Sequence, residues 1–309
     1  MLSEKRVDEE LKKSRLIAWL SLITFLIKSR SIVYGFGVAS LGTFLLVSGV
    51  KFPDLALMSR LFASVYFLAL ATYLYNDLTD YEVDQVNYKN EKNTKVRERK
   101  QISKITVIFF ALSSILSFSI NIDTGFLSLI AITLAIFYSH PRTHFKNIFI
   151  LKTVITGLGG VIASLMGATA AGNISDLALI SSLVTFLFYF INGPLNDIRD
   201  IKGDSKGGRR TIPMVLGIEH SFQIIILLVF FIGTTIFVTY CFFGIHIIGL
   251  ICGLAVCVYL GLRINKLSKN YEDKKKMNHV RTEVRNSIFY VQLSLFMGVI
   301  LNQFANIGF

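Results

Sequence analysis

Long apolar runs recur along this chain and alternate with polar connections. Most runs are close to the length of about 20 residues that a helix needs to cross a bilayer. We therefore predict nine membrane-spanning helices and an all-α, polytopic membrane protein. The predicted spans cover residues 31–50, 56–75, 105–120, 125–140, 148–170, 175–195, 221–240, 243–263 and 286–305.

The segment before the first span has a mixed character. Its first part is rich in charge, and residues 11–29 combine basic side chains with apolar ones such as Trp19 and Phe25. Such a mixture is typical of a helix that lies at the membrane interface. We interpret residues 1–30 as that segment and residues 31–309 as a nine-helix domain, with a tenth crossing as the alternative. No cleavage site follows a short apolar core, so a cleavable signal peptide is not expected.

Composition and charge agree with this interpretation. Hydrophobic residues make up 53% of the 309 positions, and the mean hydropathy is +0.58. Thirty of the 32 lysines and arginines lie on the N-terminal segment and on alternate connections, which the positive-inside rule assigns to the cytoplasm. The net charge of +12 then reflects topology and attraction to anionic membrane lipids. No nucleic-acid partner is needed to explain it.

One acidic pattern, N-D-x-x-D-x-x-x-D, occurs twice, each time at the predicted cytoplasmic end of a span. The copies consist of Asn76, Asp77, Asp80 and Asp84, and of Asn196, Asp197, Asp200 and Asp204. Residues three and four apart share a helix face, so each copy gathers its carboxylates on one stripe. Carboxylate oxygens select hard cations, and Mg²⁺ typically binds a few of them together with substrate phosphates. The two motifs predict a metal–diphosphate site inside a membrane protein.

The paired motifs resemble those of the UbiA family of intramembrane prenyltransferases, in which one follows the second span and one the sixth. The stretch from Gly203 to Gly217 is similar to the family's G-D-x-K-x-G-x-x-T-x-P-x-x-x-G run. The stretch from Tyr138 to Arg142 is similar to a Tyr-x-x-x-Lys element, with Arg142 in place of the lysine. The longer run favours the branches of the family that use lipid, chlorophyll or tocopherol acceptors.

The resemblance implies both a fold and a reaction. Nine helices would surround a central cavity, capped on the cytoplasmic side by the two Asp-bearing loops. Mg²⁺, at two sites and with Mn²⁺ able to substitute, would bridge the diphosphate of an isoprenyl donor and neutralise the leaving group. The donor would ionise to an allylic carbocation, which a lipophilic acceptor, aromatic or lipid, would attack.

The residues expected to carry this reaction fall into three groups. The metal ligands implied by the resemblance are Asn76, Asp77, Asp80, Asp84, Asp197, Asp200 and Asp204. The expected catalytic residues are Asp80, Asp200, Arg142 and Tyr138. Basic side chains complement phosphate, and the candidates for binding the diphosphate are Lys28, Arg30, Arg142, Lys146, Lys206 and Arg209.

Two other functions stay open at the level of sequence. A terpene cyclase on the same scaffold would also ionise a diphosphate, and it would trap the cation within the same isoprenoid chain. A cation transporter would use the aspartates as its ion site. Transporters usually place such charges near the bilayer midplane, often on broken helices, whereas both motifs here end a span beside a basic connection.

The charge pattern generates a topology prediction. Reporter proteins inserted in residues 85–100, 204–210 or 270–280 should be cytoplasmic, and a reporter fused after Phe309 should not be. The measurement is the activity of a reporter that works on one side of the membrane only. A cytoplasmic C-terminal reporter would mean that the predicted number of spans is wrong by an odd number.

Overall fold

The computed structural model is helical and contains no strand within the residues that it describes, which confirms the all-α class. The described residues are 17–28, 30, 33–49, 54–80, 99–143, 145–206 and 208–306. Their helices are Ile17–Lys28, α2 (Tyr34–Ser48), α3 (Leu55–Thr79), α5 (Arg99–Ile120), α6 (Ile122–Ser139), the 3-10 turn η3 (Phe145–Asn147), α7 (Leu151–Ala170), α8 (Asp176–Lys206), α9 (Ile212–Leu216), α10 (Ile218–Phe243), α11 (Ile247–Ser268) and α12 (Lys274–Asn306).

Each predicted span coincides with one of these helices. Eight helices in the described part of the chain are long and apolar enough to cross a membrane, so this is a multi-pass membrane protein. α2 is the exception, because its 15 residues rise only about 22 Å against about 30 Å of hydrocarbon. Gly49, the residue that follows Ser48, caps the C-terminus of α2 with a positive φ of 60°. The count of nine crossings therefore stays a prediction.

α8 departs most from its predicted span. It continues past Pro194 as far as Lys206, so the second acidic motif lies on a helix and not in the expected loop. An internal proline removes one helical hydrogen bond, which neighbouring groups in a membrane bundle can replace. The polar stretch after Pro194 keeps a helical pattern of burial, since Asp197 and Asp204 lie seven residues apart and are each 1% exposed.

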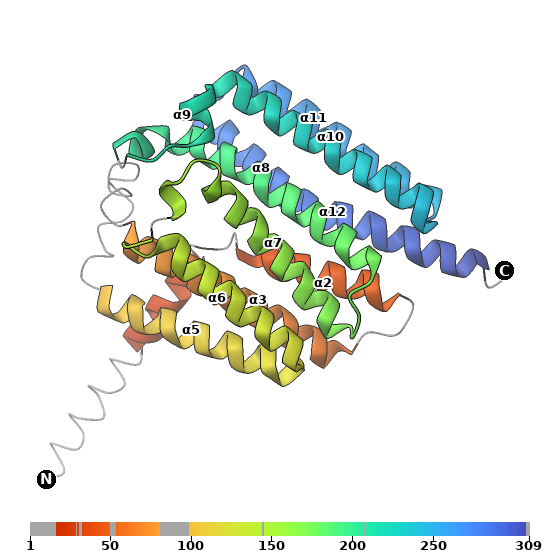
Figure 1. The fold of residues 1–309 in the computed structure, drawn as a ribbon, viewed down its shortest axis with the longest axis horizontal. Coiled ribbons are helices and arrows are strands. Elements are labelled where there is room, and N and C mark those ends of the chain that lie inside the picture. Colours follow the sequence, from red (N-terminus) through yellow and green to blue (C-terminus); the bar gives the residue numbers. More distant parts are fainter. Residues whose placement is uncertain are drawn as a thin grey trace, which may run out of the picture.

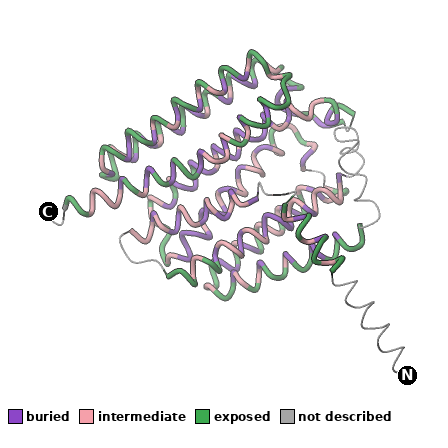
Figure 2. Tube along the Cα trace, turned by 180° about the vertical axis from the view of Figure 1, so that it is seen from behind, coloured by how far each residue is buried: buried purple, intermediate pink, exposed green. Residues whose placement is uncertain are grey.

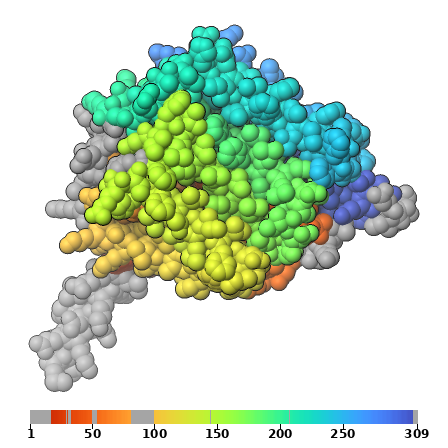
Figure 3. Space-filling model, viewed as in Figure 1, coloured from red at the N-terminus to blue at the C-terminus, as the bar shows by residue number. Residues whose placement is uncertain are grey.

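The helices run side by side, and the motif-bearing ends of α3 and α8 lie at the same end of the bundle (Figure 1). α3 packs chiefly against α5, α7 against α8 and α11 against α12, while α2 contacts α3, α7 and α12. Side chains from α5 to α11 form a continuous surface on the face shown in Figure 3. Exposed positions follow the outer sides of the helices (Figure 2), where large apolar side chains such as Phe230, Phe242 and Leu262 suit contact with lipid.

The helix Ile17–Lys28 buries one side only. Leu22 and Leu26 pack against an apolar cluster formed by α3 and α5, whereas Leu20 is exposed. One-sided burial is what an amphipathic helix provides. Residues 1–16 of the predicted interfacial segment lie outside the described residues.

Glycines set the closest approaches between helices. A Cβ atom at Gly167 of α7 would lie 2.0 Å from the backbone carbonyl oxygen of Ser40 in α2. A Cβ atom at Gly249 of α11 would lie 2.7 Å from the Cα atom of Gly298 in α12. Small residues allow this kind of backbone contact in membrane bundles.

This packing predicts that Gly167→Ala lowers the thermal stability of the protein. The added methyl group meets a backbone atom that can move only if α2 moves, and overpacking of this kind costs about 1–3 kcal/mol. Gly261→Ala is the matched control, because a Cβ atom at Gly261 meets nothing within 4 Å. The measurement is the melting temperature of the detergent-purified variants. Equal melting temperatures would contradict the close contact between α2 and α7.

Candidate active site

The described residues of the first acidic motif lie at the end of α3. Asn76 and Asp77 occupy its last turn, and Asp80 is its C-cap, with its backbone N–H donating to the Asn76 carbonyl oxygen at 2.9 Å. The amide oxygen of Asn76 accepts a hydrogen bond from Ser139 at the end of α6. Asp77 is ion-paired with Arg30. Asp84 lies outside the described residues.

The second acidic motif projects from α8 onto the first turn of α7. Lys152 Nζ lies 2.5 Å from Asp197 Oδ1 and 3.3 Å from Asp204 Oδ2. Two carboxylates seven residues apart on a helix face the same way, so one ammonium group can contact both. Asp200 instead forms an ion pair with its neighbour Arg199, with a distance of 2.7 Å between Nε and Oδ1.

Arg209 joins the two motifs. One of its terminal nitrogens lies 2.6 Å from Asp80 Oδ1, and the other lies 3.0 Å from Asp204 Oδ1. The turn after α8 places it there, because the Arg209 N–H bonds to the Asp204 carbonyl oxygen and Gly208 takes a positive φ of 66°. Burial alone would lower the pKa of Arg209, but the carboxylates of Asp80 and Asp204 outweigh burial and raise the pKa above its usual value.

Lys146 completes this arrangement from the connection between α6 and α7. Its Nζ atom lies 2.5 Å from Asp80 Oδ1 and 3.0 Å from the Thr79 hydroxyl. The buried lysine lies in η3. Asp80 therefore contacts two cations, Lys146 and Arg209, that come from distant parts of the chain. Both were expected from the sequence to bind diphosphate, and that role stays a prediction.

Tyr138 lies in the last turn of α6 and is half-buried. Its neighbour Ser139 is the member of the Tyr138–Arg142 element that donates a hydrogen bond to an acidic motif, at Asn76. The predicted catalytic role of Tyr138 is untested.

Three of the predicted site residues are on the surface. Lys28, Arg142 and Lys206 are exposed, and none of them forms an ion pair with a described carboxylate. Arg142 and Lys146 were both expected to bind diphosphate, and it is Lys146, four residues later, that lies beside Asp80. The predicted roles of the three surface residues stay predictions.

Lys152 was not among the residues predicted for the site. In sequence it is one of several basic residues near a span end, and such residues are commonly topology determinants. The available signal was its place inside the predicted span 148–170, since a charged side chain within a span is costly and usually has a function or a partner. Its partners lie 45 and 52 residues away, which sequence spacing does not reveal.

The oxygen atoms of the motifs suit a hard cation. Within the described residues, Asn196 Oδ1 and Asp197 Oδ2 are buried without a hydrogen-bond partner. Buried acceptor oxygens of this kind are expected where a ligand binds. No group of three or more His, Cys, Asp or Glu residues is arranged to hold a metal ion in the part of the chain that the structure describes. Lysine and arginine stand between the carboxylates instead. The donor chemistry therefore fits Mg²⁺, and a metal ion held by these carboxylates would displace the lysine and arginine side chains from them.

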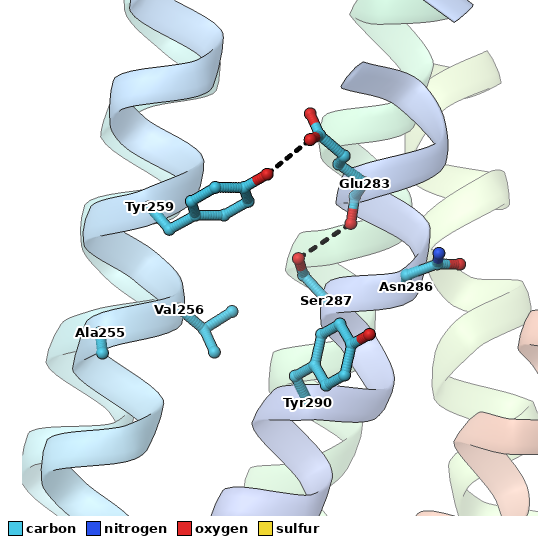
Figure 4. Close-up of a pocket in the computed structure, with 7 residues that line it drawn as sticks. All are labelled: Ala255, Val256, Tyr259, Glu283, Asn286, Ser287 and Tyr290. Carbon is cyan, nitrogen blue, oxygen red and sulfur yellow. Dashed lines mark hydrogen bonds between the residues drawn. The ribbon is translucent and has the colours of Figure 1, made fainter. Parts of the chain in front are cut away.

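A separate pocket of about 400 Å³ lies between α11 and α12 (Figure 4). Tyr259 points from α11 towards Glu283 of α12, and its hydroxyl donates to that carboxylate at 2.5 Å. Arg263 also pairs with Glu283, at 2.9 Å. The carboxylate is thus already engaged, and the pocket contains no residue of either acidic motif.

Comparison with known proteins gives one family. Over residues 36–283 the chain matches the UbiA prenyltransferase family. The digeranylgeranylglyceryl phosphate synthase of Sulfolobus acidocaldarius is 28% identical over 232 residues, which make up 74% of this chain and 81% of that relative. The enzyme of the same name from Sulfurisphaera tokodaii is 26% identical over 190 residues, or 60% of this chain and 67% of that relative.

Solved structures of other proteins share the fold, and two of them are compared with this chain. One, described as a digeranylgeranylglyceryl phosphate synthase in membranes, has a TM-score of 0.67 at 21% identity and covers 92% of this chain and 99% of its own. The other, a UbiA homolog from Archaeoglobus fulgidus bound to GPP and Mg²⁺, has a TM-score of 0.67 at 17% identity and covers 88% of this chain and 97% of its own.

The ion pairs predict that Lys152→Gln lowers the melting temperature measured in EDTA. Removing one partner of a buried ion pair costs about 3–5 kcal/mol, because the other charge stays buried. Adding Asp197→Asn should recover part of the loss. Lys202→Gln is the control, since it removes an exposed lysine of α8. A Lys152→Gln variant as stable as the control would exclude the ion pair.

Proposed function

Because the chain belongs to the UbiA prenyltransferase family, we propose that it transfers an isoprenyl group from an isoprenyl diphosphate to a lipid acceptor within the membrane. The observation that best supports this reaction is the contact of both acidic motifs with Arg209. Motifs that lie 120 residues apart in the sequence meet at one end of the bundle, and each brings carboxylates and a basic partner to the same place.

The charges at this site are balanced by side chains of the protein itself. Three buried aspartates contact three cations, and the six residues are Asp80, Asp197, Asp204, Lys146, Lys152 and Arg209. These ion pairs can exchange partners. When the lysine and arginine side chains turn to a diphosphate, the carboxylates are released to bind a metal ion. Charge then stays matched as the substrate enters, which limits the cost of burying it.

The proposed metal ligands are the carboxylates of Asp77, Asp80, Asp84, Asp197, Asp200 and Asp204, with the amide of Asn76. Mg²⁺ held there would supply the positive charge that stabilises the leaving diphosphate. That two ions bind and that Mn²⁺ can substitute are further parts of the proposal.

The side chains of the chain itself orient the donor. Arg209 presents a planar fork that suits two phosphate oxygens, and Lys146 adds a point charge beside it. Tyr138, near the end of α6, is proposed to donate a hydrogen bond to the diphosphate. With the diphosphate held, the allylic C–O bond breaks and its electron pair leaves with the diphosphate.

The acceptor completes the reaction at the allylic carbon. A hydroxyl oxygen of the acceptor forms the new C–O bond, and its proton passes to a carboxylate or to the released diphosphate. We propose a glyceryl phosphate lipid as the acceptor, because relatives that match most of this chain are named digeranylgeranylglyceryl phosphate synthases. The motif-bearing end of the bundle is proposed to face the cytoplasm, where the basic connections place it.

This mechanism predicts that Asp80→Asn lowers the transfer rate about a hundredfold, as loss of a strong electrostatic contact in the transition state does. EDTA should abolish transfer and added Mg²⁺ should restore it. Asp123→Asn is the control, because Asp123 lies in the first turn of α6, at the end away from the motifs. The measurement is the initial rate of product formation by mass spectrometry. A full rate in EDTA, or a normally folded Asp80→Asn variant with the wild-type rate, would exclude the mechanism.

A further inference from the structure

The pocket between α11 and α12 changes from polar to apolar along its length (Figure 4). Glu283 and the Tyr259 hydroxyl lie at one end, and Ala255, Val256 and the ring of Tyr290 lie towards the other. Tyr259 is 47% exposed and Tyr290 is 51% exposed, so the pocket opens on the outer surface of the bundle. Its volume of about 400 Å³ is that of a small ligand-binding cavity.

The apolar end of the pocket lies at the depth of lipid acyl chains. α11 runs from Ile247 towards the motif-bearing end of the bundle (Figure 1). Along the helix axis, Ala255 lies about 12 Å and Arg263 about 24 Å from Ile247. Because the hydrocarbon layer is about 30 Å thick, Arg263 comes close to the lipid headgroups on the motif side. The pocket lies among the acyl chains of that leaflet.

Arg263 is held at this level with hydrogen-bond donors to spare. Its Nε atom donates to Glu283 Oε2 at 2.9 Å, and the Tyr259 hydroxyl donates to the other carboxylate oxygen at 2.5 Å. His279 Nε2 also lies 3.3 Å from Glu283 Oε1. Within the described residues, neither terminal nitrogen of Arg263 makes a hydrogen bond, and the side chain is 30% exposed. Glu283 thus orients a guanidinium group whose terminal nitrogens can bind a phosphate oxygen.

The connection from α11 to α12 adds an excess of positive charge beside this arginine. Four of its lysines are exposed and form no ion pair with a described carboxylate, namely Lys266, Lys269, Lys274 and Lys275. Glu272 is the one acidic residue of the described segment 263–285 that has no basic partner. Lys266 lies three residues after Arg263 and therefore on the same side of α11. The headgroup end of the pocket is consequently basic.

We propose that this pocket and the lysines beside it bind a bilayer phospholipid with an anionic headgroup. One acyl chain occupies the pocket beside Ala255 and Tyr290. The phosphate accepts hydrogen bonds from the terminal nitrogens of Arg263, and Lys266 attracts the net negative charge of the headgroup. This inference depends on the membrane location of the chain and not on the transfer reaction.

Charge complementarity favours a lipid over a second copy of this chain. A two-fold contact places the same surface patch of both copies together. Such a contact at this pocket would bring two basic connections against each other, and like charges repel. An anionic lipid instead supplies an apolar chain for the pocket and a negative charge for the lysines.

The headgroup test measures lipid binding to the detergent-purified full-length protein by native mass spectrometry. The probes are phosphatidylglycerol and phosphatidylcholine with identical acyl chains. The wild type should bind phosphatidylglycerol about tenfold more tightly, and Lys266→Gln should reduce that preference about fivefold, as expected for one basic side chain near anionic lipid. Lys104→Gln should keep the preference, because it removes an exposed lysine from α5, which packs against α3 and α6. Arg263→Lys should weaken binding of both lipids, since it keeps the charge without the fork.

The acyl-chain test fills the pocket without changing any charge. Ala255→Phe should weaken binding of both lipids about tenfold, which corresponds to about two buried methylene groups displaced. Val258→Phe is the matched control, because Val258 is 64% exposed on the same helix and does not line the pocket. If Ala255→Phe does not fold, Ala255→Leu decides.

Three results would overturn the proposed lipid site. One is an equal loss of preference in Lys266→Gln and Lys104→Gln, which would mean that the lipid is attracted by the basic surface in general. Another is equal binding by Ala255→Phe and Val258→Phe, which would mean that no acyl chain enters the pocket. The third is a dimer of the wild type in detergent that Ala255→Phe alone dissociates, which would identify a second copy as the occupant.

Discussion

Neutralisation of buried carboxylates by cations from distant segments is the interaction on which the motif end of this protein depends. Asp80, Asp197 and Asp204 are buried at the end of an apolar bundle, where unpaired charges would be costly. Arg209 contacts carboxylates from both α3 and α8, and Lys152 brings in the start of α7. The ion pairs therefore tie α3 to α8 at the motif end and add to the packing between α7 and α8.

The same interaction connects structure with chemistry. A cluster held together by apolar contacts alone would contain no charged groups that could change partners when a substrate binds. Here every cation that holds the bundle end together is also a group that can bind phosphate, and every carboxylate is a group that can bind a divalent ion. Contacts with the donor and the metal can thus replace the ion pairs within the protein, so that no buried charge is left without a partner.

The helices could be predicted from sequence because a bilayer imposes a minimum apolar length, and each predicted span coincides with a helix. The end of α8 was predictable only in part. The spacing of the second motif suggested a helix face, but the predicted span ended at residue 195, and the buried contacts of Asp197 and Asp204 with Lys152 and Arg209 involve residues that lie apart in the sequence. The acidic motifs were recognisable by spacing. Their partners were not, since a lysine at a span end looks the same whether it contacts Asp80 or faces solvent, as the contrast between Lys146 and Arg142 illustrates.

α2 combines a length that is too short for the hydrocarbon layer with extensive cover by other helices, because none of its 15 residues is exposed and seven are buried. Hydrophobic matching acts on surfaces that touch lipid, so the surrounding bilayer does not set the length of this helix. Its first turn is held by a protein contact, the hydrogen bond between Tyr34 and Asn286. The depth of that turn is consequently fixed within the molecule, and a thinner or thicker membrane would act on the outer helices α10 and α11 and leave it in place.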